Sequence, residues 1–152
     1  KKIKNKIPDI GLTTDIIVGF PGETDDDFQD TLDVVNEVGF ENAFMFMYSV
    51  RSGTPAATMD EQVSEQVKSE RLQQLMRLQN MKAKEETKKY LDQTIKVLVE
   101  GPSKKNPEML TGRTSTHKIA LFKSDRTDLK GKFVNIRVYD TKTWTLYGEM
   151  VE

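Results

Sequence analysis

The chain has 152 residues, enough for one domain or two small ones, and 36% of them are hydrophobic. It has no cysteine and one histidine, which excludes disulfides, thiolate zinc sites, cysteine-ligated iron–sulfur clusters and most other transition-metal sites within these residues. No apolar run is long enough for a membrane span, and no signal-peptide pattern is present, so we expect a cytoplasmic protein with no membrane partner.

The net charge is −1, but the charged residues are distributed unevenly along the chain. Residues 92–152 hold 11 lysines and arginines against 8 acidic residues, which makes this part the better candidate for binding an anion.

A strand is predicted close to the start of the chain. Residues 1–6 alternate basic and apolar side chains and are expected to end a helix, because Pro8 breaks the pattern. The apolar run at 12–20 is typical of a parallel strand buried on both faces. The pair Pro21-Gly22 then turns the chain.

A helix with a cap at each end follows this turn. Thr24 is a natural N-cap with Asp27 three residues on, a weak form of the capping box, and Gly39 is placed to end the helix. The aspartates at 25–27 suit the positive end of the helix dipole, and we interpret them as part of the cap rather than as a metal site. A second buried strand is expected at 43–48. Strand, helix and strand of this length indicate a βαβ crossover.

The second half of the chain changes from a helical to a strand pattern. Helix-forming residues dominate 61–90, where a broad apolar stripe is formed by Val63, Val67, Leu72, Leu75, Met76, Leu78 and Met81. Five short strands separated by turn residues are then predicted at 94–99, 109–114, 118–122, 132–139 and 145–151. Five strands in about sixty residues suggest a small Greek-key or OB-like barrel.

Polar, glycine-containing loops follow both predicted strands of the first half. The loop at 19–24 is not a P-loop, because no Gly-Lys-Ser/Thr follows, and by itself it is explained as a tight turn with a helix cap. The loop at 48–55 lies at the end of the neighbouring strand. Since α/β folds bind ligands at the carboxyl ends of their strands, the two loops together predict one wall of a small-molecule site.

Basic and aromatic residues alternate in the predicted barrel. Basic groups neutralise phosphates and aromatic faces stack on unpaired bases, which favours RNA binding over a merely solvated surface. The residues concerned are Arg113, Lys118, Lys123, Lys130, Lys132, Arg137 and Lys142, with Phe122, Tyr139, Trp144 and Tyr147.

Several stretches together resemble one family, the radical S-adenosylmethionine methylthiotransferases, and within it the tRNA 2-methylthio-isopentenyladenosine synthases. In the first half the matching stretches are TDIIVGFPGET at 14–24, YSVRSGTPAA at 48–57 and KSERL at 68–72. In the barrel they are VLVEG at 97–101, LTGRT at 110–114 and KTWTLYGE at 142–149.

The resemblance implies an α/β plus all-β fold. Residues 1–58 would be the last βα units of a partial, TIM-like radical S-adenosylmethionine barrel, 59–91 a long bridging helix or helices, and 92–152 an OB-like TRAM domain that binds RNA. In the family, the strand equivalent to 12–20 contacts the adenine of S-adenosylmethionine. The cofactor-binding residues that follow by resemblance are Ile17, Val18, Gly19, Tyr48, Ser49 and Arg51. The RNA-binding residues expected in the barrel are Arg113, Lys118, Phe122, Lys123, Lys132 and Trp144.

Family members also use two 4Fe-4S clusters held by six cysteines, and this chain has none of them. We therefore expect a C-terminal part of such an enzyme, inactive alone, with neither clusters nor S-adenosylmethionine bound, whose partners are the missing N-terminal part and a tRNA anticodon stem-loop. Two alternatives remain: the sister enzymes that modify a ribosomal protein, and a free-standing RNA-binding module. Open strand edges also predict possible self-association.

Overall fold

The computed structural model describes residues 2–151. The chain forms two compact units, one of Leu12–Lys82 and the other of Ala83–Glu152 together with Lys1–Gly11. Among the described residues, no helix combines the length and apolar character needed to cross a membrane.

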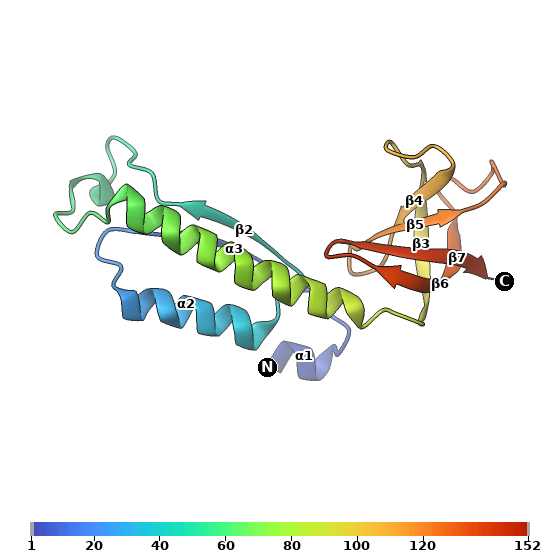
Figure 1. Cartoon of the computed structure of the whole chain (residues 1–152), viewed down its shortest axis with the longest axis horizontal. Helices are drawn as coiled ribbons and strands as arrows, with labels where there is room; N and C mark the ends of the chain where they lie inside the picture. Colours follow the sequence, from blue (N-terminus) through green and yellow to red (C-terminus); the bar gives the residue numbers. More distant parts are fainter. Residues whose placement is uncertain (1, 152) are drawn as a thin grey trace. The chain divides into compact units, whose positions relative to one another are not determined.

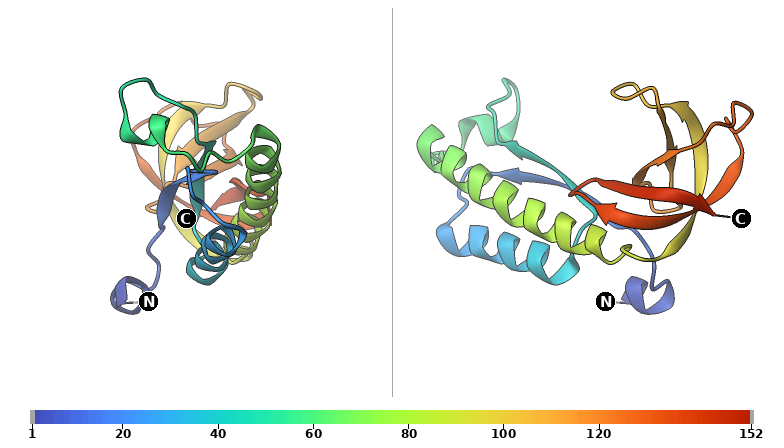
Figure 2. Two further views of the ribbon diagram at one scale, coloured as in Figure 1. Left: turned by 90° about the vertical axis from the view of Figure 1, so that its left-hand side faces the viewer. Right: turned by 45° about the vertical axis from the view of Figure 1, so that its right-hand side comes forward.

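The first unit is a strand–helix–strand motif with a second helix packed beside it. Strands β1 (Thr13–Val18) and β2 (Asn42–Met47) are parallel neighbours, in register from Thr13 opposite Asn42 to Val18 opposite Met47. Helix α2 (Asp25–Val38) connects them. It lies with the first part of α3 (Glu65–Lys88) on one side of the strand pair (Figures 1 and 2). The predicted strand–helix–strand order is confirmed.

The expected caps of α2 are both present. The Thr24 hydroxyl accepts a hydrogen bond from the Asp27 amide at 3.1 Å, and the Asp27 carboxylate accepts one from the Thr24 amide at 2.9 Å. The Thr24 hydroxyl also donates to the Asp27 carboxylate at 2.7 Å, and this bond together with the one from the Thr24 amide lowers the pKa of Asp27, because both stabilise the ionised carboxylate. Gly39 ends the helix with φ of 61°, a left-handed conformation that glycine adopts without steric penalty.

Only one face of the β1–β2 pair is covered. Val18 packs with Phe28 and Val35 of α2 and with Leu75 of α3. On the other face Ile17 and Phe44 keep 56% and 58% of their surface exposed, with Phe46 similarly open. The prediction that both strands are buried on both faces is therefore wrong for this side, because alternate side chains point away from the helices and no described segment covers them.

Helix α3 buries a stripe of six side chains, four of which are polar or charged. The buried positions recur every three or four residues, and they are Lys68, Arg71, Leu75, Gln79, Ala83 and Thr87. In the first unit the Gln79 amide donates to the Phe40 carbonyl at 2.9 Å. The apolar stripe predicted here is correct at Leu72, Leu75 and Leu78 but wrong at Met76 and Met81, which are exposed because the helix is rotated to bury its polar positions.

The second unit is a closed five-stranded barrel. Its strands are β3 (Thr94–Pro102), β4 (Met109–Arg113), β5 (Ile119–Lys123), β6 (Phe133–Thr141) and β7 (Thr145–Val151). They close in the order β3-β4-β5-β7-β6, and β5 and β7 are the one parallel pair among them. This is the arrangement of an OB-like Greek-key barrel, as predicted (Figure 2).

Aliphatic side chains and one phenyl ring fill the barrel. Val97, Phe122, Ile136 and Leu146 belong to its fully buried core. Where β4 pairs with β3, a side chain at Gly112 would lie 2.6 Å from the Leu98 carbonyl, so only glycine fits there.

The last turns of α3 are fixed to the barrel by Thr87. Its buried hydroxyl lies within hydrogen-bond distance of the Thr143 carbonyl at 2.9 Å and of the Ala83 carbonyl at 2.7 Å, and these two acceptors share its single proton. It also accepts a bond from the Lys118 ammonium at 2.9 Å. One hydroxyl therefore joins the helix to two separate turns of the barrel.

Replacing this hydroxyl tests its contribution. Thr87→Val keeps the shape but leaves the Thr143 carbonyl and the Lys118 ammonium each with one bond fewer, so we expect a loss of about 1–3 kcal/mol in unfolding free energy. Urea unfolding followed by the fluorescence of Trp144 measures it. Thr127→Val, at an exposed loop position, is the matched control. Equal midpoints for the two variants would show that the Thr87 bonds contribute nothing.

Candidate functional site

The carboxyl ends of β1 and β2 lie side by side, as the site predicted from the sequence requires. The Tyr48 amide, just after β2, donates to the carbonyl of Val18 at 2.8 Å. The loops after the two strands therefore begin next to each other, which is where parallel sheets place a ligand crevice.

The turn after β1 is held by its own glutamate. Gly19 has φ of 71°, and its amide donates to the Glu23 carboxylate at 2.9 Å. The Gly22 amide donates to the carbonyl of Glu61 at 2.8 Å. The amides of both glycines thus have acceptors, which fixes the turn at these two positions.

A buried arginine of α3 holds this glutamate in place. The Arg71 side chain, only 7% exposed, donates to the Glu23 carboxylate at 2.7 Å and to its carbonyl at 3.1 Å. Its other terminal nitrogen donates to Asp25 at 2.7 Å, and its guanidinium lies 5.6 Å from the ring centre of Phe28. Burial works to lower the pKa of Arg71, but its hydrogen bonds to the Asp25 and Glu23 carboxylates outweigh burial and raise the pKa.

A buried lysine fills the space beside the turn. A side chain at Gly19 would overlap the Lys68 methylenes, so the glycine is needed for the lysine to lie there. The Lys68 ammonium is bonded to Glu65 at 2.8 Å and lies 5.4 Å from the ring centre of Tyr48. The Tyr48 ring in turn meets Phe20 edge to face, with ring centres 5.2 Å apart. Its hydroxyl is buried and has no hydrogen-bond partner among residues 2–151.

The residues predicted to bind S-adenosylmethionine divide into two groups. Ile17 lies on the exposed face, in register with Phe46, and Ser49 and Arg51 are exposed in the loop after β2. These three form the exposed group. Tyr48 is half-buried, with its ring next to Lys68 of α3, and belongs with Val18 and Gly19 to the group that contacts the helices.

Two of the predicted contacts need correction. The Val18 side chain is fully buried against the helices, because it alternates with Ile17, so only its backbone faces the strand ends. The close approach that Gly19 permits is that of the Lys68 stem.

The sequence interpretation missed Glu23, Lys68 and Arg71 as a group. Both basic residues lie within the KSERL stretch, which served only as part of the family resemblance. Their spacing could have revealed them, because Lys68 and Arg71 lie seven and four residues before Leu75 and so fall on the same buried stripe of the helix. Charges at inward positions of a helix need buried partners, and Glu23 was the nearest acid in the facing loop.

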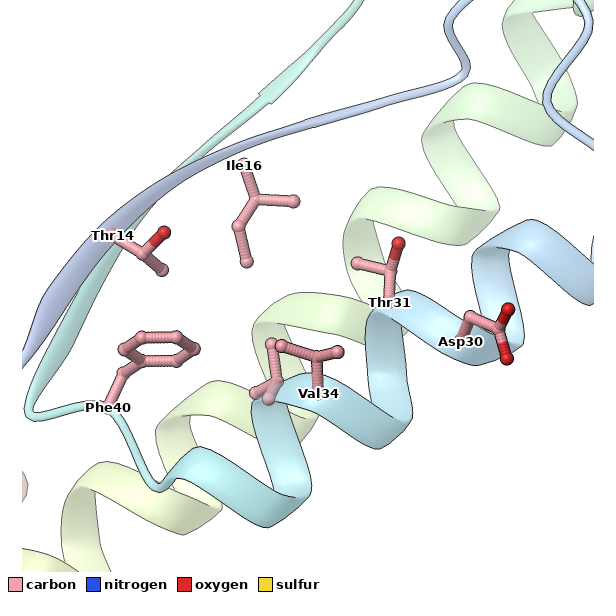
Figure 3. A pocket seen from close by; sticks show the side chains of 7 residues that line it. Thr14, Ile16, Asp30, Thr31, Val34 and Phe40 are labelled. Carbon is pink, nitrogen blue, oxygen red and sulfur yellow. The ribbon is translucent and has the colours of Figure 1, made fainter. Parts of the chain in front are cut away.

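A hollow of about 260 Å³ lies on the opposite, helix-facing side of β1. Figure 3 shows Thr14 and Ile16 of β1 facing Thr31 and Val34 of α2, with Phe40 at one end. The walls are mainly apolar, and the Thr31 hydroxyl is already bonded to the Asp27 carbonyl at 3.2 Å. Among the described residues, no group of histidine, cysteine or acidic side chains is placed to hold a metal ion.

Glu23→Gln tests whether the carboxylate fixes the turn. It keeps the shape but removes the charge that balances buried Arg71, so we expect the first unit to lose roughly 2–4 kcal/mol. Hydrogen exchange at the Gly19 amide, which donates to Glu23, should accelerate correspondingly. Asp26→Asn, an exposed neighbour in the first turn of α2, is the control. Unchanged exchange at Gly19 would contradict this role.

In the second unit, two of the six residues predicted to bind RNA are buried. Phe122 is fully buried in the core, because its position on β5 alternates inward. Lys118 is 6% exposed, and its ammonium is bonded to Thr87. Neither side chain is available to RNA in this conformation, and both predictions are corrected.

The other four lie on the surface. Lys123 is exposed at the end of β5, and Trp144 is 40% exposed in the turn between β6 and β7. Arg113 pairs with Glu100 at 3.2 Å. Lys132 pairs with Asp128 at 2.7 Å, and Arg126 and Lys132 together lower the pKa of Asp128. Exposed pairs of this kind open at little cost when a phosphate approaches.

Comparison with known proteins identifies the barrel and relates both units to one group of enzymes. Residues 88–151 match the TRAM domain family, so the barrel is a TRAM domain. Over 150 residues, 99% of the chain, it is 61% identical to the tRNA-2-methylthio-N(6)-dimethylallyladenosine synthase of Fusobacterium nucleatum, of which it covers 34%.

Proteins of the same name show similar agreement. The one from Acetivibrio thermocellus is 54% identical over 150 residues, with 99% of this chain and 31% of the relative covered. The one from Alkaliphilus oremlandii is 50% identical over 152 residues, with 100% and 32% covered. The resemblance drawn from the sequence is confirmed, and the chain spans about a third of the length of these relatives.

Proposed function

We propose that the chain is the C-terminal part of a tRNA methylthiotransferase, in which the TRAM domain binds tRNA. The observation that carries this proposal is the extent of the match. Identity of 61% runs through 99% of the chain, and so through both units rather than through the TRAM domain alone. A shared RNA-binding module would account for the barrel but not for the strand–helix–strand unit.

The reaction proposed for the whole protein is the addition of a methylthio group to an isopentenyl-modified adenosine beside the anticodon, in the cytoplasm. Relatives named for this tRNA product favour it over the alternative of a ribosomal-protein substrate. Each of these relatives is about three times as long as the chain, which favours part of an enzyme over a free-standing module.

The two 4Fe-4S clusters do not fit this chain, because iron–sulfur clusters are held by thiolates and the sequence has no cysteine. Their ligands would have to come from the rest of the enzyme. We therefore propose that the 152 residues alone are inactive.

S-adenosylmethionine fits the ends of β1 and β2 better. We propose that the first unit is the last part of a separate, TIM-like radical S-adenosylmethionine barrel that binds this cofactor. Ile17 and Phe46 are exposed, adjacent and apolar, as an adenine ring requires. The unpartnered Tyr48 hydroxyl is a buried polar atom suited to a ligand, and Arg51 is exposed where it could pair with a carboxylate. When bound, this cofactor supplies the methyl group and the radical. Arg71 and Glu23 would act indirectly, by holding the turn after β1 in one position.

The two-stranded sheet of the first unit also has open edges among the described residues. We propose that these edges are covered by the rest of the enzyme, and that in its absence the chain can associate with a second copy.

RNA binding is the part of this proposal that the chain can test directly. The 152-residue protein should bind an anticodon stem-loop RNA with an affinity that falls as salt rises, because phosphate contacts release counterions. Lys132→Ala and Arg113→Ala should each weaken binding and lower the slope of log K against log salt by about 0.7–0.9. Fluorescence anisotropy at several salt concentrations measures both quantities.

Lys84→Ala, on the exposed side of α3, is the matched control and should leave the slope unchanged. Absence of binding at low salt would overturn the RNA-binding role of the barrel. Binding with no salt dependence would overturn the assignment of Arg113 and Lys132 to phosphates.

A further inference from the structure

One outward face of the barrel carries exposed aromatic rings that contribute little to its core. Along β6, Val134, Ile136 and Val138 point inward and are buried, whereas Phe133, Asn135, Arg137 and Tyr139 point outward. Phe133 is 62% exposed and Tyr139 is 56% exposed. Two exposed aromatic rings on one outward strand face add almost nothing to the buried core. Grouped apolar surface of this kind indicates a contact surface.

Strand β3 adds apolar and basic neighbours to the same face. Leu98 is in register with Phe133, and Lys96 is in register with Asn135. The diagonal offset brings the Lys96 ammonium to 4.8 Å from the centre of the Phe133 ring. On the far side of β3, Arg113 of β4 is in register with Leu98.

These residues define a surface that we call the stacking face. Its members are Lys96, Leu98, Phe133, Arg137 and Tyr139. The two rings at its ends are six residues apart on one strand, which is about 20 Å and leaves room between them for more than one nucleotide. Lys96 and Arg137 place positive charge beside the rings, and the exposed Leu98 extends the apolar surface next to Phe133.

The combination points to unpaired RNA. Every base has an aromatic face, and a base can stack on a protein ring only when it is not paired within a duplex. A charged backbone that passes the ring needs cations close by, and Lys96 and Arg137 supply them. Glu149 of β7 is in register with Arg137 and balances part of its charge, so Lys96, over the Phe133 ring, is the cation best placed for a phosphate. A protein partner would have to bring a charged group of its own to Lys96 beside an apolar pair, and charged residues are depleted at the centre of protein interfaces.

We propose that the stacking face binds single-stranded RNA, with one unpaired base stacked on Phe133 and the adjoining phosphates at Lys96 and Arg137. This inference rests on the proposed RNA-binding function and adds to it the nucleotide state that the barrel selects. The Lys96 ammonium, which covers part of the Phe133 ring, moves to the phosphate when the base arrives.

The test compares Phe133→Ala with the wild-type 152-residue chain on two probes. One probe is an oligoadenylate of about ten nucleotides, within the footprint of one OB-type fold, and the other is a duplex RNA of equal length. Wild type should prefer the single strand. Phe133→Ala should bind the single strand about 5- to 150-fold more weakly, the effect expected for one stacked base, and bind the duplex as before.

Salt dependence separates stacking from charge. Phe133→Ala removes no cation, so its slope of log K against log salt should equal that of wild type, whereas Lys96→Ala should lower the slope by about 0.7. Phe133→Trp should keep the affinity for the single strand, since an indole also stacks. Met81→Ala, an apolar truncation at a half-exposed position of α3, is the control for nonspecific effects.

Each outcome decides one question. If wild type binds neither probe nor the anticodon stem-loop, the proposed RNA-binding function fails and the stacking inference falls with it. If wild type binds but Phe133→Ala binds the single strand equally well, the function stands and the stacking inference is wrong. Equal losses on single strand and duplex would also overturn it. Circular dichroism of each variant confirms that the exposed substitutions leave the barrel folded.

Discussion

The first unit depends on the ion pair between Arg71 and Glu23. A two-stranded sheet with one covered face has a small core, and the end that we propose binds a ligand is a turn built on glycines, which by themselves favour no single conformation. The glutamate accepts from the Gly19 amide on one side and from Arg71 on the other, so the turn and α3 share one acceptor. Removal of either charge would take from the other its buried ionic partner and leave Arg71 with exposed Asp25 or Glu23 with the Gly19 amide, which is more costly than loss of an exposed pair.

The same logic extends along α3. Its buried stripe places a polar side chain opposite each element that the helix must hold: Arg71 at the turn after β1, Gln79 at the Phe40 carbonyl, and Thr87 at the Thr143 carbonyl of the barrel. Apolar packing is tolerant of small rotations and shifts, whereas each of these bonds is satisfied in one geometry only. The helix therefore contributes positional specificity as well as buried area, within each of the two units that it serves.

The sequence predicted the elements of this fold well and its surfaces less well. Strand and helix positions follow from hydrophobic period and from caps such as Thr24 and Gly39, which act locally and are visible in a few residues. Burial is a tertiary property. Phe122 and Phe133 are both phenylalanines in predicted strands, yet Phe122 lies in the barrel core and Phe133 on its surface. They differ only in whether their position in the strand's alternation faces inward or outward, which the sequence does not reveal. Lys118 shows the same difficulty, since a lysine is expected outside unless a partner such as Thr87 is known.

The contact between Gly19 and Lys68 restricts how the chain can vary. The space that a side chain at position 19 would need is already filled by the methylenes of a lysine that lies 49 positions further along the chain. A shorter residue at 68 would free that space but remove the cation beside Tyr48, and the positive φ at 19 would still penalise any residue other than glycine. Homologues that carry lysine at position 68 are therefore expected to carry glycine at position 19, whereas position 68 can shorten while the glycine stays, a one-way dependence between distant positions that neither residue type would suggest.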